Sequence, residues 1–285
     1  MNVVAIGGGH GTAVTLQALR RLSNAVTGVV SVADNGGSSG RLREMMDVAA
    51  VGDLRKCLVA LACPNNELAT VFEHRFSRGD LQGHPLGNLL LVGLLDADVD
   101  LVDAVALVGR LLNITGDILP ASTKGVTLIA QTDGGRTEGQ VQVAAAANVR
   151  RISTQPDFVR APKQVVAAIE NAQLVVIGPG SLYTSLIAAC VVPGIREALR
   201  RTKARRVYVA NLRDQERETT GMSLRDHVDS LRDHGICFDL ALVSANREMD
   251  DGIVNFPLVE GELTWANARV HDASKLAACL SGLVA

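Results

Sequence analysis

Residues 2–22, NVVAIGGGHGTAVTLQALRRL, join a short apolar run to a glycine-rich turn and then to a segment with helical spacing. The next stretch, residues 25–33 (AVTGVVSVA), is apolar and β-branched, which is typical of a buried strand. A strand, a helix and a second strand of these lengths predict a parallel, right-handed crossover. The helical spacing is carried by Val14, Leu16, Leu19 and Leu22.

The same alternation of strand-like and helix-like segments continues along the chain. Residues 125–145 alternate on both sides of Asp133-Gly134-Gly135 and predict an antiparallel hairpin. Asp53 precedes a run with helical spacing, so we expect it to cap a helix. Together these elements predict one doubly wound α/β domain over residues 1–285, with a small β insertion near 121–155. The remaining strands are expected at 172–178, 205–211 and 238–246, and further helices at 54–61 and 84–95.

Composition narrows the function classes. The chain carries 28 basic and 30 acidic side chains, a net charge of -2, and aromatic residues make up 3% of it. Balanced charge and few stacking side chains argue against nucleic acid as a partner. The five cysteines have no CxxC spacing and indicate small core residues in a reducing compartment. They are Cys57, Cys63, Cys190, Cys237 and Cys279.

One uncharged stretch, residues 171–195, is long enough to suggest a membrane span. Gly178-Pro179-Gly180 and Pro193-Gly194 interrupt it, so we expect a buried strand, a turn and a helix instead. The chain also starts without the basic segment of a signal peptide. We therefore expect a cytoplasmic protein with no membrane span.

Three polar loops follow predicted strands, where ligands bind in open parallel sheets. In the first, residues 7–12 (GGGHGT), glycines let backbone amides approach phosphate oxygens at a helix start. The second, residues 31–44 (SVADNGGSSGRLRE), combines Asp34 with hydroxyls and arginines and suits a sugar phosphate or metal phosphate. The third, residues 178–185 (GPGSLYTS), offers a second diphosphate cradle. Ordinary turns and helix caps are the alternative explanation for each loop.

Two smaller features leave alternatives open. His84 and Asn88, in GHPLGN, share a helix face if the helix begins early enough, and either contact a ligand or cap the helix. Residues 220–235 predict an amphipathic helix, which is either a surface helix or a homodimer face. The HExxH motif is absent from the sequence, and neither zinc sites nor hydrolase triads are expected.

The ordered series of motifs resembles the YvcK-like gluconeogenesis factor family, which belongs to the CofD (2-phospho-L-lactate transferase) superfamily. The resemblance runs from residue 3 to about residue 245 and implies a Rossmann-like fold that binds a nucleotide. UDP-sugars such as UDP-N-acetylglucosamine are the implied ligands. The implied role is regulation of growth on gluconeogenic carbon and of cell shape, through a regulatory protein partner. Besides the three loops, the motifs are VGDLRKCLVALA, GHPLGNLLL, LNITGDILPAS and VYVANLRDQERETTGMSLRDHV.

The superfamily also implies an alternative function. Its transferases move a phospholactyl group from a guanosine diphosphate carrier with a divalent metal, so Asp34 and Asp53 are the expected catalytic or Mg²⁺-binding residues in that case. An NAD-dependent dehydrogenase is a weaker alternative, because the full glycine fingerprint is missing. The chain departs from the family at His10, which replaces a threonine, and at Asn35, which replaces a second aspartate. A third departure lies in ETTGM, where Thr220 and Met222 replace the more usual acid and aromatic residue.

The loops and the resemblance together predict one nucleotide-binding site. Its members are Gly8, Gly9, His10, Gly11, Thr12, Asp34, Asn35, Gly37, Ser38, Ser39, Arg41, Asp53, His84, Asn88, Gly178, Gly180, Ser181, Tyr183 and Asn211.

Overall fold

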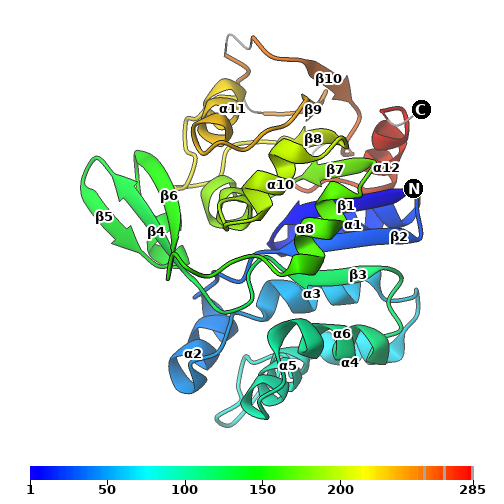
Figure 1. Ribbon diagram of the computed structural model, residues 1–285, viewed down its shortest axis with the longest axis vertical. Coiled ribbons are helices and arrows are strands. Elements are labelled where there is room, and N and C mark those ends of the chain that lie inside the picture. The colour runs from blue at the N-terminus through cyan, green and yellow to red at the C-terminus, as the bar shows by residue number, and fades with distance from the viewer. Residues whose placement is uncertain (249, 253–254, 266–267, 284–285) are drawn as a thin grey trace.

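The computed structural model describes residues 1–248, 250–252, 255–265 and 268–283. Its main sheet has seven strands in the order β10-β9-β8-β7-β1-β2-β3, and all neighbouring strands are parallel (Figure 1). This arrangement confirms the expected Rossmann-like α/β fold. The strands are β1 (Asn2–Gly7), β2 (Ala25–Val30), β3 (Asp117–Pro120), β7 (Leu174–Ile177), β8 (Arg205–Val209), β9 (Leu240–Ser244) and β10 (Leu258–Gly261).

Helices cover both faces of this sheet. Helices α8 and α10 lie on one face, and α1, α3 and α12 lie on the other (Figure 1). Every residue of β7 and β9 is buried, as expected for parallel strands covered on both sides. The helices are α1 (Gly9–Arg20), α2 (Gly37–Met46), α3 (Gly52–Leu61), α4 (Glu67–Glu73), α5 (Leu86–Asp96), α6 (Leu101–Leu111), α7 (Gln140–Ala144), α8 (Lys163–Glu170), the π-helix η1 (Leu182–Ile187), α9 (Ala188–Cys190), α10 (Ile195–Arg201), α11 (Leu224–Asp233) and α12 (Ala273–Ser281).

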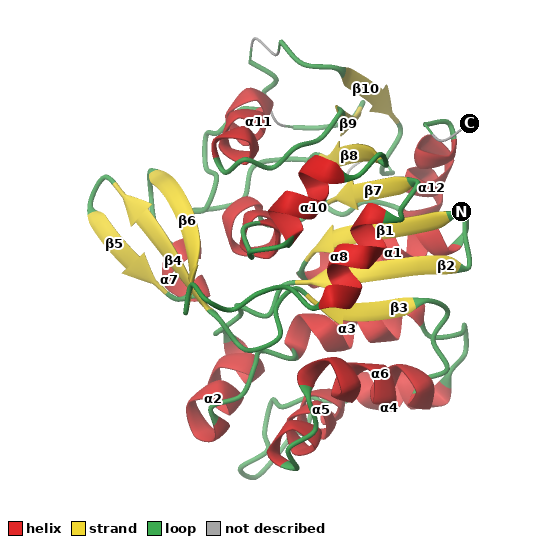
Figure 2. Cartoon of the chain, viewed as in Figure 1, coloured by secondary structure: helices red, strands yellow, loops and turns green. Residues whose placement is uncertain are grey.

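The β insertion is a separate antiparallel sheet of three strands, β5-β4-β6 (Figure 2). The predicted hairpin joins β4 (Thr127–Thr132) to β5 (Gly135–Glu138), and β6 (Val149–Gln155) adds a third strand. The predicted strand alternation to residue 145 is wrong, because Gln140–Ala144 form helix α7. Gly139 turns the chain with φ at +91°, and Asn35 accepts a hydrogen bond from the amide of Val141 at 2.9 Å. This long-range contact is invisible to a local pattern.

The start of α3 also differs from the prediction. The helix begins at Gly52 with Val51 as its N-cap, so Asp53 lies inside the first turn and makes no capping bond. Its carboxylate instead pairs with Lys56 one turn later, at 3.0 Å. An aspartate in the first turn still stabilises the positive end of the helix dipole.

The uncharged segment 171–195 divides as expected into a strand, a turn and helical segments. Among the described residues, no single helix is long and apolar enough to cross a membrane. The pair Leu182–Cys190 and Ile195–Arg201 reaches that length only together, and it is bent by 73° across the break that contains Pro193-Gly194.

The amphipathic helix and the cysteines can now be placed. The apolar side chains of α11 (Leu224, Val228 and Leu231) are buried inside the chain, so they do not offer a dimer face. All five cysteines are free. Cys63 is exposed, so the expectation that the cysteines are core residues is wrong for Cys63.

Candidate functional site

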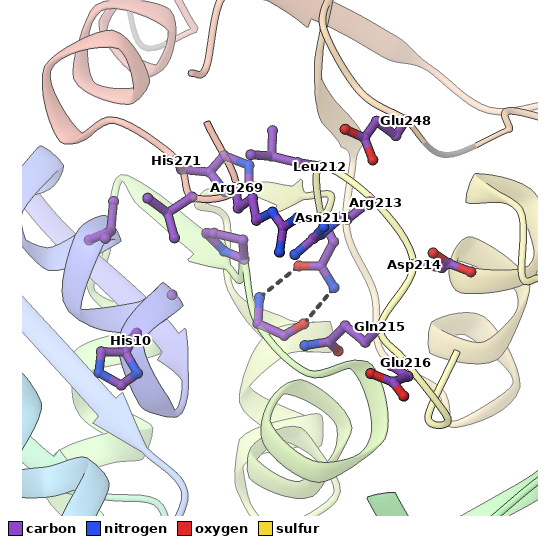
Figure 3. Close-up of a pocket in the computed structure, with 15 residues that line it drawn as sticks. His10, Asn211, Leu212, Arg213, Asp214, Gln215, Glu216, Glu248, Arg269 and His271 are labelled. Carbon is purple, nitrogen blue, oxygen red and sulfur yellow. Dashed lines mark hydrogen bonds between the residues drawn. The ribbon is translucent and has the colours of Figure 1, made fainter. Parts of the chain in front are cut away.

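The loops after β1, β7 and β8 surround a cavity of about 610 Å³. Strands β1, β2 and β3 follow one another toward one edge of the sheet, and β7, β8, β9 and β10 follow one another toward the other edge. The strand order therefore reverses between β1 and β7. Open α/β sheets bind ligands outside this switch point. His10 lies on the α1 side of the cavity, and Gln215 and Glu216 lie on the opposite side (Figure 3).

The first turn of α1 forms one wall of this cavity through His10 and Gly11. No side chain caps the helix at Gly8, and its first turn holds no acidic residue. The amides that begin an α-helix lack intrahelical partners and attract anions. A Cβ on Gly11 would lie 2.2 Å from the carbonyl oxygen of Pro179, so glycine is required where the two loops meet. The start of α1 is therefore a ready donor surface for a phosphate.

Thr12, another predicted binding residue, faces inward. It is 1% exposed, and its hydroxyl donates a hydrogen bond to the carbonyl of Gly8 at 3.2 Å. Thr12 therefore shapes the glycine loop from inside.

The loop after β7 differs, because its helix amides are already bonded. The amides of Tyr183 and Thr184 donate to Oε1 of Glu218 at 2.8 and 2.9 Å. Glu218 is 8% exposed, and burial raises the pKa of its carboxyl group. Asn211 fixes Gly180 by two hydrogen bonds, one to the amide at 3.1 Å and one to the carbonyl at 2.9 Å (Figure 3). The chain's own carboxylate thus binds the amides that were expected to bind phosphate.

Sequence reasoning missed the role of Glu218. It lies 34 residues from Thr184 along the chain, and no local pattern links the two.

Two arginines that sequence reasoning also missed, Arg213 and Arg269, bring positive charge to the cavity. Neither forms an ion pair with another residue of the described ranges. Arg213 lies two residues beyond the strand-end residue Asn211, so the strand-end rule was a signal that could have found it. Arg269 comes from the segment before α12 and has no such signal. The acidic side chains of Glu216 and Glu248 line the same cavity, so its walls carry both charges.

Asp34 and Asp53 form a second part of the site with His10. A Cβ on Gly8 would lie 2.8 Å from Oδ2 of Asp53, which places this carboxylate directly beside the first glycine loop. Burial raises the pKa of Asp34, and the charge of Asp53 adds to the effect. Burial and the nearby charge of Lys56 lower the pKa of His10, whereas the charge of Asp53 raises it. Asp53 raises the pKa of both Asp34 and His10, so it links the two electrostatically.

His84 precedes α5, which begins at Leu86, so it does not share a helix face with Asn88 and does not cap that helix. The side chains of His84 and Asn88 meet at a buried hydroxyl. Oγ of Ser38 lies 2.8 Å from Nδ1 of His84 and 3.0 Å from Nδ2 of Asn88. Nε of Arg55 donates to Oδ1 of Asn88 at 3.0 Å, and Arg55 pairs with Glu73. Ser38, His84, Asn88 and Arg55 are each at most 8% exposed. This network holds α2, α3 and α5 together and lies outside the cavity.

Other predicted side chains bond elsewhere in the fold. Asn35 binds the start of α7, and Arg41 donates to the carbonyl of Gln82 at 2.9 Å. The hydroxyl of Tyr183 lies 3.2 Å from that of Ser230 and faces a second cavity of about 470 Å³. The predicted residues that line the first cavity are His10, Gly11, Gly180 and Asn211.

Comparisons with known proteins place this arrangement in a family. A family model described as 2-phospho-L-lactate transferase CofD matches residues 3–273. The chain belongs to the CofD family. A relative from Mycobacterium tuberculosis is 41% identical over 308 residues, covering 99% of this chain and 90% of the relative. A protein of Halalkalibacterium halodurans named "Gluconeogenesis factor" is 40% identical over 236 residues, covering 82% of this chain and 73% of that protein.

A solved structure has the same fold as this chain over almost its full length. It is a crystal structure of a member of the upf0052 family from Bacillus halodurans, with a TM-score of 0.91 and 34% sequence identity. The match covers 98% of both chains.

Asp34 and Asp53 are the carboxylates expected to hold a divalent metal in a CofD-family transferase. No group of three or more metal-ligating side chains occurs within the ranges that the structure describes. Asp53 pairs with Lys56, and Oδ1 of Asp34 accepts a hydrogen bond from the amide of Gly36 at 2.8 Å. Mg²⁺ is commonly held by one or two carboxylates together with substrate phosphates and water. The two aspartates fit that shared mode and do not form a complete protein site.

Proposed function

We propose that this chain is a regulatory protein that binds a nucleotide sugar, with UDP-N-acetylglucosamine as the leading ligand. Its proposed role is control of growth on gluconeogenic carbon sources and of cell shape. The observation that carries the proposal is the uncapped N-terminus of α1 at a cavity beside the strand switch point. A diphosphate suits this position, because it is the anionic group that backbone amides and a helix dipole bind well.

The charged side chains around the cavity support the same ligand class. Arg213 and Arg269 line the same cavity as the start of α1. Arginine binds phosphate oxygens with paired hydrogen bonds. The relative named a gluconeogenesis factor supports the regulatory role.

The alternative is a Mg²⁺-dependent transferase that acts on a nucleoside diphosphate carrier. It is favoured by the family model, which describes a transferase, and by the carboxylate of Asp53 beside the glycine loop. In this case Asp34 and Asp53 would hold Mg²⁺ against the phosphates of the carrier. The metal would supply charge neutralisation during group transfer.

Calorimetric titration separates the two functions. The ligands are UDP-N-acetylglucosamine, GDP and NAD, each with and without Mg²⁺. Binding of the UDP-sugar in preference to GDP and NAD, without a metal requirement, is the expected result. Preference for GDP that depends on Mg²⁺ would contradict the proposal and favour the transferase.

A matched pair of variants tests the position of the ligand. Arg213→Gln removes a cavity guanidinium, and we expect UDP-sugar affinity to fall about tenfold, since a hydrogen bond to a charged group contributes about 1.5–3 kcal/mol. Arg78 is exposed and does not line the cavity, so Arg78→Gln serves as the control with unchanged affinity.

A further inference from the structure

Two buried polar atoms at the cavity wall have no hydrogen-bond partner. They are Oε1 of Gln215 and Nε2 of His271, named here the acceptor pair. Four buried side-chain atoms without a partner occur among the described residues. Two of them, the acceptor pair, belong to residues that line this cavity. Gln215 comes from the loop after β8, and His271 comes from the segment before α12 (Figure 3). Buried polar groups in folded proteins normally have partners, so this concentration at one cavity requires a cause.

The amide of Gln215 is oriented by its other bonds. Its Nε2 donates to Oγ of Ser181 at 3.1 Å, and its backbone amide donates to Oγ1 of Thr219 at 2.8 Å. With the nitrogen used in this way, the unpartnered atom is the carbonyl oxygen, which accepts hydrogen bonds and cannot donate.

The imidazole of His271 presents the same chemistry. An interaction with the backbone of Ala210 raises the pKa of His271, as a ring nitrogen that donates to a carbonyl does, and Nε2 is the nitrogen without a partner. Burial lowers the pKa of His271 to about 4, so the ring is neutral at physiological pH. A neutral ring that donates from Nδ1 carries a lone pair on Nε2 and accepts there.

We propose that the acceptor pair is a subsite for the hydroxyl or N–H groups of the ribose or base of the bound nucleotide. This inference rests on the proposed function and specifies which wall recognises the uncharged part of the ligand. The proposed diphosphate position is the start of α1, whereas the acceptor pair requires hydrogen-bond donors. Both atoms lack solvent exposure, so we expect the loops that carry them to shift toward the ligand when it binds, with the hydrogen bond from Gln215 to Ser181 kept.

Paired titrations with UDP and with inorganic diphosphate test the subsite. Gln215→Met and His271→Phe each remove an acceptor while keeping much of the side-chain volume. We expect each variant to bind UDP about tenfold more weakly, because an acceptor bond is lost, while inorganic diphosphate affinity stays within about twofold. Unchanged UDP affinity, or an equal fall for both ligands, would overturn the proposal. Gln17→Met and His74→Phe, at exposed positions outside the cavity, are the matched controls.

Nitrogen NMR of the wild-type protein gives a test that needs no variant. We expect UDP to move the Nε2 resonance of His271 upfield, as an acceptor nitrogen does when it gains a hydrogen bond, while His74 stays in place. Saturating UDP that leaves the His271 resonance unmoved would overturn this proposal and leave the proposed function intact. Failure of the wild type to bind either UDP or the UDP-sugar would instead defeat the proposed function, and this proposal with it.

Discussion

Gly8 lies against the carboxylate of Asp53, so closely that a Cβ on Gly8 would come within 2.8 Å of Oδ2. The same Cβ would lie 3.3 Å from Oγ of Ser185. Gly8 is in an extended conformation with φ at -164°, which any residue adopts, so space and not backbone geometry requires glycine here. This contact joins the first glycine loop to the acidic cluster and makes them parts of one site.

Gly8→Ala should therefore reduce stability through crowding. The carboxylate of Asp53 is held by Lys56, so we expect the free energy of unfolding to fall by about 1–3 kcal/mol. Gly93→Ala is the control, because a Cβ there meets no atom within 4 Å inside α5 and should stabilise the helix by about 0.5–1 kcal/mol. Denaturant unfolding measures both variants, and a Gly8→Ala protein as stable as the wild type would contradict the contact.

Glu218 should be a structural hydrogen-bond acceptor for η1. Glu218→Ala leaves the buried amides of Tyr183 and Thr184 without an acceptor, and we expect a loss of about 2 kcal/mol in the free energy of unfolding. Glu218→Gln keeps an acceptor oxygen and should lose less. Equal losses in the two variants would contradict this role.

The same residue should give stability a distinct pH dependence. Because burial raises the pKa of Glu218 above its ordinary value of 4.5, the folded state favours the protonated carboxyl. Its contribution to stability is present at low pH and is lost as pH rises through the folded-state pKa. We expect the stability of the wild type to fall relative to that of Glu218→Gln as pH rises above 4.5. Parallel pH profiles would contradict the shift.

The network around Asn88 should affect stability and not ligand binding. Asn88→Ala removes the acceptor of the buried Arg55 and a donor to Ser38, and we expect a loss of about 2–3 kcal/mol. Since this network lies outside the cavity, folded Asn88→Ala protein should bind the UDP-sugar with wild-type affinity. Calorimetry that shows a large loss of affinity in folded protein would instead make Asn88 a ligand residue, as its sequence pattern predicts.

His10 should couple ligand binding to protonation. Burial and Lys56 lower the pKa of its imidazole in the free protein, and a diphosphate at the start of α1 would raise it. Binding would then take up a proton, so affinity for UDP-N-acetylglucosamine should increase as pH falls from about 8 to 6. His10→Thr should flatten this dependence. Identical pH profiles for the two proteins, measured by calorimetry, would place the diphosphate away from His10.

Local sequence patterns predict the sheet well because parallel strands are buried on both faces. β7 is apolar throughout, and β1, β2, β8 and β9 each contain a mostly apolar run that predicts a buried strand. The failure at α7 has a specific cause, since Gln140 to Ala144 alternate like a strand. Gly139 and the distant Asn35 make them a helix. Tertiary contacts overrode the local pattern there.

The candidate site was predictable only where it is built from strand ends. His10, Gly11, Gly180 and Asn211 were found because each follows a buried strand. The role of Glu218 and the positions of Arg269 and His271 depend on how distant loops return to the cavity. The spacing of residues along the sequence does not predict which distant loops reach the cavity.

The central claim, that a diphosphate binds at the start of α1 and not at η1, is tested most directly by backbone amide NMR. Titration with UDP-N-acetylglucosamine should produce its largest shifts at the amides of Gly9, His10 and Gly11. The amides of Tyr183 and Thr184 should remain near their starting positions, because Glu218 keeps them bonded. Large shifts at Tyr183 and Thr184, with none at the start of α1, would contradict the account.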